Sequence, residues 1–169
     1  MPEKETLERA EKDKRQGKSP STQAGEFVKE EMDHVREGKH GARSAKQAIA
    51  IGLSKARRAG VKLPPPKKGA ASERTRRQAE HDTAKGSSGS KRKPSRKRSR
   101  AISSALKREG HSAASRSALS RQAHSSAEKR GAANRSQTAR KAVRTKGPSG
   151  RKRAAQKAAR TRARHSRSR

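Results

Sequence analysis

The large hydrophobic residues of this chain concentrate in two short stretches near its N-terminus. The first stretch predicts an amphipathic helix over about residues 22–37, because its apolar residues follow helical spacing. Ser21 or Thr22 can cap the start of this helix, and Gly38 can end it. Four large apolar residues lie on or beside the predicted buried face: Phe27, Val28, Met32 and Val35.

The second stretch predicts another amphipathic helix after a short loop. Ser44 and Gln47 match a capping box at its start. Gly60 stands where a left-handed residue commonly ends a helix, and Val61 supplies the apolar contact that goes with it. The prolines at 64–66 then form a stiff spacer. Its apolar stripe has the spacing i, i+3, i+4, i+7, i+8, i+11: Ala45, Ala48, Ile49, Gly52, Leu53 and Ala56.

Two amphipathic helices joined by a short loop predict an antiparallel helical hairpin near the N-terminus. The small residues of the second helix should allow the two helices to approach closely. So small a module has little apolar surface to bury, and we expect it to be marginally ordered, to dimerise or to fold on binding. The expected packing residues are Phe27, Val28, Met32, Val35, Ala45, Ala48, Ile49, Gly52, Leu53 and Ala56.

The rest of the chain shows no comparable apolar stripe. Nine of the 15 large aliphatic, Met or aromatic residues lie between Phe27 and Leu63, and the chain has a net charge of +33. Few bulky apolar residues with a large net charge are typical of disorder, because burial cannot offset chain entropy. We therefore expect a mostly disordered chain with a small all-α element. Its cationic Ala/Lys/Arg/Ser tail should form only transient helices, including one over about residues 72–85 without an apolar face.

Composition divides the chain into four segments. They are a charged lead-in over 1–20, the hairpin module over 21–63, a Pro/Gly/Ser-rich basic linker over 64–100, and a basic low-complexity tail over 101–169. Residues 1–69 hold 17 basic and 10 acidic residues, whereas residues 70–169 hold 31 and 5. The positive charge therefore belongs mainly to the C-terminal part.

So large a positive charge indicates a polyanionic partner, and nucleic acid is the obvious candidate. The densest basic runs predict phosphate contacts without base readout. Single-strand stacking is not expected, because the tail has no aromatic residue. The residues expected to contact nucleic acid are Lys91, Arg92, Lys93, Arg96, Lys97, Arg98, Arg100, Arg151, Lys152, Arg153, Lys157, Arg160, Arg162 and Arg164.

The hairpin has basic residues of its own, and its two-helix shape invites comparison with a helix-turn-helix. A DNA-reading version of that motif normally needs a third helix to complete its core, so we favour a solvated helix surface instead. The basic residues in question are Arg43, Lys46, Lys55, Arg57, Arg58 and Lys62.

Other kinds of chemistry find little support in the sequence. The absence of cysteine excludes disulfides and thiolate ligands. Asp33, His34 and His40 are near one another in sequence, but their spacing matches no zinc pattern, and we expect no metal site. No Walker motif or hydrolytic triad occurs, so we expect no enzyme and no cofactor. No apolar run could span a membrane, and the Glu-rich start is no signal peptide, which favours the cytoplasm.

Residues 25–68 contain the string EGKHGARSAKQAIAIGLSKARRAGVKLPPP, from Glu37 to Pro66. This region resembles a domain family found in short basic bacterial proteins of uncharacterised function. The basic tail is similar in composition to bacterial linker-histone-like proteins. The resemblances imply a bacterial cytosol and supply no catalytic or binding residue.

These observations favour a histone-H1-like, nucleoid-associated protein that binds nucleic acid without sequence specificity. Duplex DNA is the favoured partner and RNA is possible, with self-association or a protein partner through the hairpin. One alternative is a ribosome- or RNA-associated structural protein. Another is a protein-interaction adaptor whose basic tail only localises it.

Overall fold

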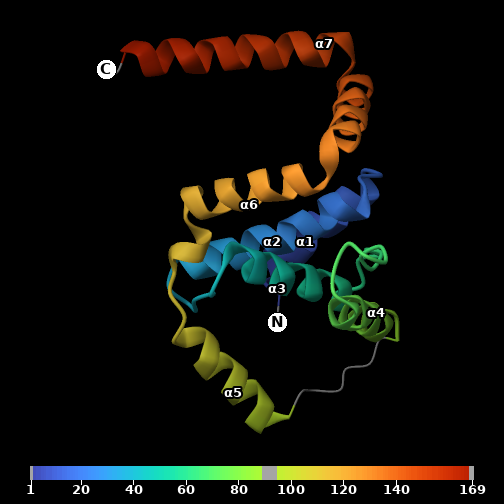
Figure 1. The fold of residues 1–169 in the computed structure, drawn as a ribbon, viewed down its shortest axis with the longest axis vertical. Helices are drawn as coiled ribbons and strands as arrows, with labels where there is room; N and C mark the ends of the chain where they lie inside the picture. Colours follow the sequence, from blue (N-terminus) through green and yellow to red (C-terminus); the bar gives the residue numbers. More distant parts are fainter. Residues whose placement is uncertain (1, 89–94, 168–169) are drawn as a thin grey trace. The chain divides into compact units, whose positions relative to one another are not determined.

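The computed structural model of the chain is all-α over the residues that it describes, 2–88 and 95–167 (Figure 1). Side chains are described as far as Arg164. Within these ranges the structure contains seven α-helices and one 3₁₀ helix. In chain order they are α1 (Lys4–Arg15), α2 (Pro20–Arg36), α3 (Ala45–Arg58), α4 (Glu73–Ser87), α5 (Arg96–Lys107), η1 (Ser112–Ala114), α6 (Arg116–Lys129) and α7 (Gly131–Arg167).

The expectation of a mostly disordered chain with transient helices in the tail is wrong. Helices cover most of the described residues, including nearly all of the segment expected to be low-complexity tail. Disorder was inferred from the scarcity of residues that could form a core. A helix, however, satisfies its backbone hydrogen bonds locally, and Ala, Arg, Lys and Gln, which are abundant here, have high helix propensity.

The chain forms two compact units, Met1–Gln122 and Ala123–Arg169, with the boundary inside α6. The second unit contains the end of α6 and the whole of α7. Helix α7 is interrupted at Gly147, whose φ of 63° and ψ of 176° are not helical. Pro148 follows this break, and a proline suits the first turn of a helix because its missing N–H would have no partner there.

The first unit is built around the α2–α3 pair, with α1 packed on α2, α4 packed on α3, and η1 packed on both α2 and α3. One apolar cluster surrounds Phe27, which is only 1% exposed. It also contains Ala10, Ala24, Ala56 and Val61. The second cluster contains Met32, Val35, Ala42, Ala48, Ala113 and Ala114. The two alanines of η1 thus complete a core that the sequence analysis assigned to α2 and α3 alone.

The α2–α3 hairpin is confirmed, with one error at its start. Helix α2 begins at Pro20, and the residue before it, Ser19, takes the cap position without a side-chain cap bond. Capping by Ser21 or Thr22 was therefore wrong. At the start of α3, Ser44 Oγ accepts a hydrogen bond from the Gln47 amide at 3.2 Å, as the capping box predicts, but the Gln47 side chain accepts its bond from the Arg43 amide at 2.9 Å rather than from Ser44. Gly60 also has the expected left-handed φ, 91°.

Close approach of α2 and α3 depends on Gly52. A Cβ atom built at this position would lie 2.7 Å from Val28 Cα and 3.0 Å from the Phe27 carbonyl oxygen. Both neighbours are backbone atoms of α2, which a side-chain rotation cannot move. Any larger residue would therefore push the two helices apart, as the predicted use of small residues implies.

Helix α4 docks on α3 through a buried carboxylate. Asp82 is 1% exposed and accepts hydrogen bonds from Ser54 Oγ at 2.6 Å and Arg58 Nε at 2.7 Å. Gln78 Nε2 donates a third bond at 3.0 Å. Burial raises the pKa of Asp82, but the interactions with its partners, Ser54 and Arg58 above all, lower it by more than burial raises it. The pKa of Asp82 is therefore below its usual value. The sequence predicted this helix but gave no face by which it could pack.

Candidate nucleic-acid interface

Helix α7 carries a high density of positive charge that its own residues do not neutralise. Residues 131–167 contain 13 Lys and Arg and no Asp or Glu. Every one of these basic side chains that the structure describes is exposed. Lysine and arginine stems lose little rotamer freedom in a helix, so a helix can hold them in fixed order along its surface.

Four of the predicted contact residues form one stripe along the second half of α7. Arg153, Lys157, Arg160 and Arg164 follow the spacing i, i+4, i+7, i+11, which places them on one face. With a rise of about 1.5 Å per residue, the stripe is about 16 Å long. Arg151 and Arg162 project from the other side of this helix.

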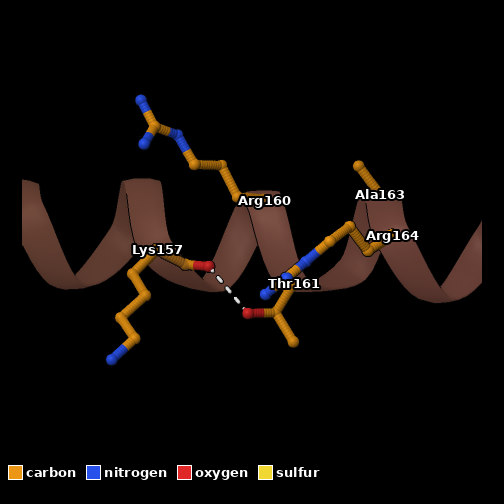
Figure 2. Close-up of a pocket in the computed structure, with 5 residues that line it drawn as sticks. All are labelled: Lys157, Arg160, Thr161, Ala163 and Arg164. Atoms are coloured by element: carbon orange, nitrogen blue, oxygen red, sulfur yellow. Dashed lines mark hydrogen bonds between the residues drawn. The ribbon is translucent and has the colours of Figure 1, made fainter.

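Lys157, Arg160 and Arg164 of the stripe line an open pocket with Thr161 and Ala163. Figure 2 shows these five side chains on α7. Lys157 and Arg160 extend away from the helix in different directions. Because both side chains extend away from the helix, their cationic ends are where a phosphate could reach them. Thr161 Oγ1 donates a hydrogen bond to the Lys157 carbonyl oxygen at 3.0 Å, and this bond does not engage either cation.

The other predicted basic run lies partly on α5. Arg96, Lys97, Arg98 and Arg100 occupy the first half of this helix and are exposed. Lys91, Arg92 and Lys93 lie outside the described residues. Positive charge at the start of a helix opposes the helix dipole, and an anion there would relieve the conflict.

The basic residues of the hairpin have mixed roles. Lys55 lies 2.7 Å from Glu31 and 3.2 Å from Glu30, while Arg58 bonds to Asp82. Burial lowers the pKa of Arg57, whose guanidinium donates to the Pro64 carbonyl oxygen at 3.3 Å.

The remaining basic residues of the hairpin, Arg43, Lys46 and Lys62, are exposed. Lys55 and Arg58 are thus engaged with carboxylates of the first unit, and Arg57 is largely buried. The basic face considered for a helix-turn-helix is therefore much reduced.

The predicted packing residues lie on α2 and α3, and each of them is at least partly buried. Val28, Ile49 and Leu53 are partly buried against the two apolar clusters. The other seven are buried: Phe27, Met32, Val35, Ala45, Ala48, Gly52 and Ala56.

A cluster of charged side chains on α2 was missed by the sequence analysis. Glu31 is completely buried, and Glu30 is 3% exposed. Burial raises the pKa of Glu30, but hydrogen bonds from the Glu3 amide, Thr6 and Lys55 bring it below its usual value. Glu31 lies four residues after Phe27 and four before Val35, so it is on the same helix face as these two apolar residues. A charged residue on the apolar face was the sequence signal that could have revealed this buried cluster.

The N-terminus is held against this cluster. Glu3 Oε1 lies 2.8 Å from His34 Nε2 and 3.0 Å from Lys39 Nζ. The bonds from His34 and then Lys39 lower the pKa of Glu3 to about 2. His34 and His40 lie with their rings edge to face, 6.0 Å apart between centroids. Asp33, which the sequence grouped with these histidines, instead pairs with Arg36 at 3.1 Å.

Comparison with known proteins identifies one region of the chain. No curated protein and no solved structure is significantly similar to it. No helix among the described residues is long and apolar enough to cross a membrane. The expected domain family of unknown function is confirmed, and its match begins earlier than the resemblance at 25–68. Residues 13–68, from the end of α1 to just beyond α3, form a domain of a family of unknown function (DUF6496).

Proposed function

We propose that the chain binds nucleic acid, duplex DNA in particular, by neutralising phosphates without reading the base sequence. The observation that carries this proposal is α7, with 13 basic and no acidic residues. Duplex DNA carries one negative charge per ~1.7 Å of axis, so one helix of this kind can neutralise several phosphates at once. The exposed basic residues of α5 would add to the same effect.

Phosphate contact suits these side chains better than base recognition. The stripe of Arg153, Lys157, Arg160 and Arg164 is exposed, and no second layer of described contacts fixes its orientation. Stacking on single-stranded bases needs aromatic surfaces, and the one Phe of the chain, Phe27, is buried in the core. Duplex binding therefore has more support than single-strand binding.

The biological setting that we propose is the bacterial nucleoid, in the cytoplasm. Basic residues project from more than one side of α7, because Arg151 and Arg162 lie away from the stripe. One helix could then contact two duplexes, which is the behaviour of a histone-H1-like protein. The domain at residues 13–68 would position the chain, through self-association or a protein partner.

The test is a fluorescence-anisotropy titration of the full chain against duplex DNA, single-stranded DNA and structured RNA over a salt series. We expect the tightest binding to duplex DNA. If about eight phosphates are contacted, log K should fall with log salt at a slope of about −7. A preference for structured RNA would instead support the ribosome-associated alternative, and binding that ignores salt would contradict phosphate neutralisation.

A matched pair of variants would locate the contact. The variant R153Q/K157Q/R160Q/R164Q removes the stripe, and K12Q/K14Q/K46Q/K62Q removes four exposed charges from the first unit. The first should weaken DNA binding on the order of 100-fold and reduce the salt slope by about 3 to 4. The second should have a much smaller effect. Equal losses would mean that net charge, and not α7, determines binding.

A further inference from the structure

The Glu31 carboxylate is buried in an unusual environment. The side chain has no exposure, and neither oxygen accepts a hydrogen bond of good geometry. Two nitrogen atoms nevertheless lie close to this carboxylate. The Lys55 ammonium nitrogen is 2.7 Å from Glu31 Oε2, and His40 Nε2 is 3.3 Å from Glu31 Oε1. A buried carboxylate without well-formed hydrogen bonds is costly, so this group points to a further ligand.

Two histidines approach the same carboxylate from different parts of the chain. His34 lies one turn after Glu31 on α2, and His40 lies in the loop that leads to α3. One ligand atom from each of Glu31, His34 and His40 lies within 4.8 Å of the others. Both imidazoles are mostly buried, with 13% and 18% of their side chains exposed.

One of the ligand separations matches a small tetrahedral ion, while the three ligand atoms together lie within 4.8 Å of one another. Zinc binds nitrogen at about 2.0–2.1 Å and carboxylate oxygen at about 2.0–2.2 Å, so two tetrahedral ligand atoms lie roughly 3.3–3.5 Å apart. The observed distance between His40 Nε2 and Glu31 Oε1 is 3.3 Å. Glu3 Oε1, 2.8 Å from His34 Nε2, resembles the outer carboxylates that orient metal-bound histidines.

The charge balance of this region favours a cation. Four carboxylates, those of Glu3, Glu30, Glu31 and Glu37, face the two ammonium groups of Lys39 and Lys55. Two negative charges therefore remain when the histidines are neutral. Lys55 contacts Glu31 through Oε2, which leaves Oε1, the atom that faces His40, for a metal ion.

We propose that Glu31, His34 and His40 form a binding site for a divalent transition-metal ion such as Zn²⁺, with Glu3 as a positioning residue. This departs from the expectation of no metal site, which considered Asp33 with the two histidines and did not include Glu31. The bound ion would link the loop between α2 and α3, through His40, to Glu31 and His34 on α2. Its effect would be to stabilise the domain at residues 13–68, independently of nucleic-acid binding.

The test begins with chelator-treated full-length protein titrated with Co²⁺ and with Zn²⁺. We expect one equivalent to bind, the visible absorption bands of tetrahedral Co²⁺ to appear, and the melting temperature to rise with metal concentration. X-ray absorption of the zinc-loaded protein should show nitrogen and oxygen ligands, two of them imidazoles. Absence of a saturable single site, or a ligand set without imidazole, would overturn the proposal.

Variants assign the ligands. His34→Ala and His40→Ala should abolish the cobalt spectrum, whereas His81→Ala and His124→Ala, at exposed histidines, should leave it unchanged. Glu3→Gln should weaken binding about 10- to 100-fold, as expected for an outer carboxylate. Circular dichroism identifies any variant that fails to fold, and X-ray absorption of the unaltered chain decides the question without variants. A spectrum that survives His34→Ala and His40→Ala would refute the assignment.

Discussion

Helices α1–α4 and helix α7 both carry many basic residues, but only the first group supplies carboxylates to match them. Residues 2–88 contain 21 basic and 13 acidic residues, against 13 and none in residues 131–167. In the first region the charges join helices to one another, as Arg9 on α1 does with Glu26 on α2 at 2.8 Å. In α7 no carboxylate of the helix can serve this purpose.

A strongly basic composition can therefore support two kinds of structure. The first region is held by tertiary contacts, so single substitutions at those contacts should destabilise it. Helix α7 is held by local hydrogen bonds and propensity, so substitution of its surface cations should change binding far more than stability. Four predictions test this contrast.

Of the four expected changes in stability, the largest is at Gly52, where α2 and α3 touch through backbone atoms. Gly52→Ala places a Cβ 2.7 Å from Val28 Cα, and we expect a loss of about 3 kcal/mol in the free energy of unfolding. The matched control is Gly25→Ala, also within a helix, where a Cβ meets nothing within 4 Å. The control should be stabilised by up to about 1 kcal/mol through helix propensity. Urea unfolding followed by circular dichroism measures both, and equal behaviour would contradict the close approach.

The next effect concerns Asp82, which joins α4 to α3. Asp82→Asn removes the charge from its hydrogen bonds with Ser54 and Arg58, and should cost about 2 kcal/mol at pH 7. Asp33→Asn, at a half-exposed pair with Arg36, should cost less than about 0.5 kcal/mol.

The pH dependence of Asp82→Asn gives an independent check. Because the pKa of Asp82 is lowered below 3.8 in the folded state, its contribution is present above that pH and is lost as the pH falls towards the folded pKa. The difference between Asp82→Asn and the unaltered chain should therefore narrow between pH 5 and strongly acidic conditions. A constant difference would show that the charge of Asp82 is not what stabilises α4.

The α2–α3 hairpin and the docking of α4 show how far the sequence could predict the structure. The signals that delimit α3 are local: Ser44 and Gln47, at its start, are three residues apart, and Gly60 ends the helix through its own backbone conformation. Periodicity and end signals therefore predicted the hairpin. The partners of Asp82 on α3, Ser54 and Arg58, are by contrast 28 and 24 residues away, and no residue near Asp82 in the sequence indicates them.

The same limit explains the errors elsewhere. Ala113 and Ala114 belong to a stretch with no apolar stripe, yet they complete the core beside Met32 and Val35. Net charge describes the chain as a whole, while helix formation in α7 depends on local propensity, so the charge did not indicate that α7 would be helical. Of the candidate interface, the basic residues could be predicted from composition, but their alignment into a stripe needed the helix.

A smaller effect should distinguish the two serines at the helix starts of the first unit. Ser44→Ala removes the cap bond to the Gln47 amide and should cost about 1 kcal/mol. Ser19→Ala should cost less than about 0.5 kcal/mol, because Ser19 makes no side-chain cap bond to α2. Thermal unfolding of the two variants side by side measures the difference. A larger loss at Ser19 would reverse the assignment of the caps.

The smallest effect on stability is expected in α7, where substitution should increase helix stability instead of reducing it. Arg153 and Lys157, like Arg160 and Arg164, are like charges four residues apart, and each such pair destabilises a helix by about 0.2–0.5 kcal/mol. K157Q/R164Q breaks both pairs, so the helical signal at 222 nm should rise slightly at low salt while DNA binding weakens. Salt at about 1 M, where the screening length is about 3 Å, should give the unaltered chain the same gain. A loss of helix in K157Q/R164Q would mean that these cations stabilise α7. Helix α7 would then depend on its charged side chains as α1–α4 do, and the contrast between the two regions would fail.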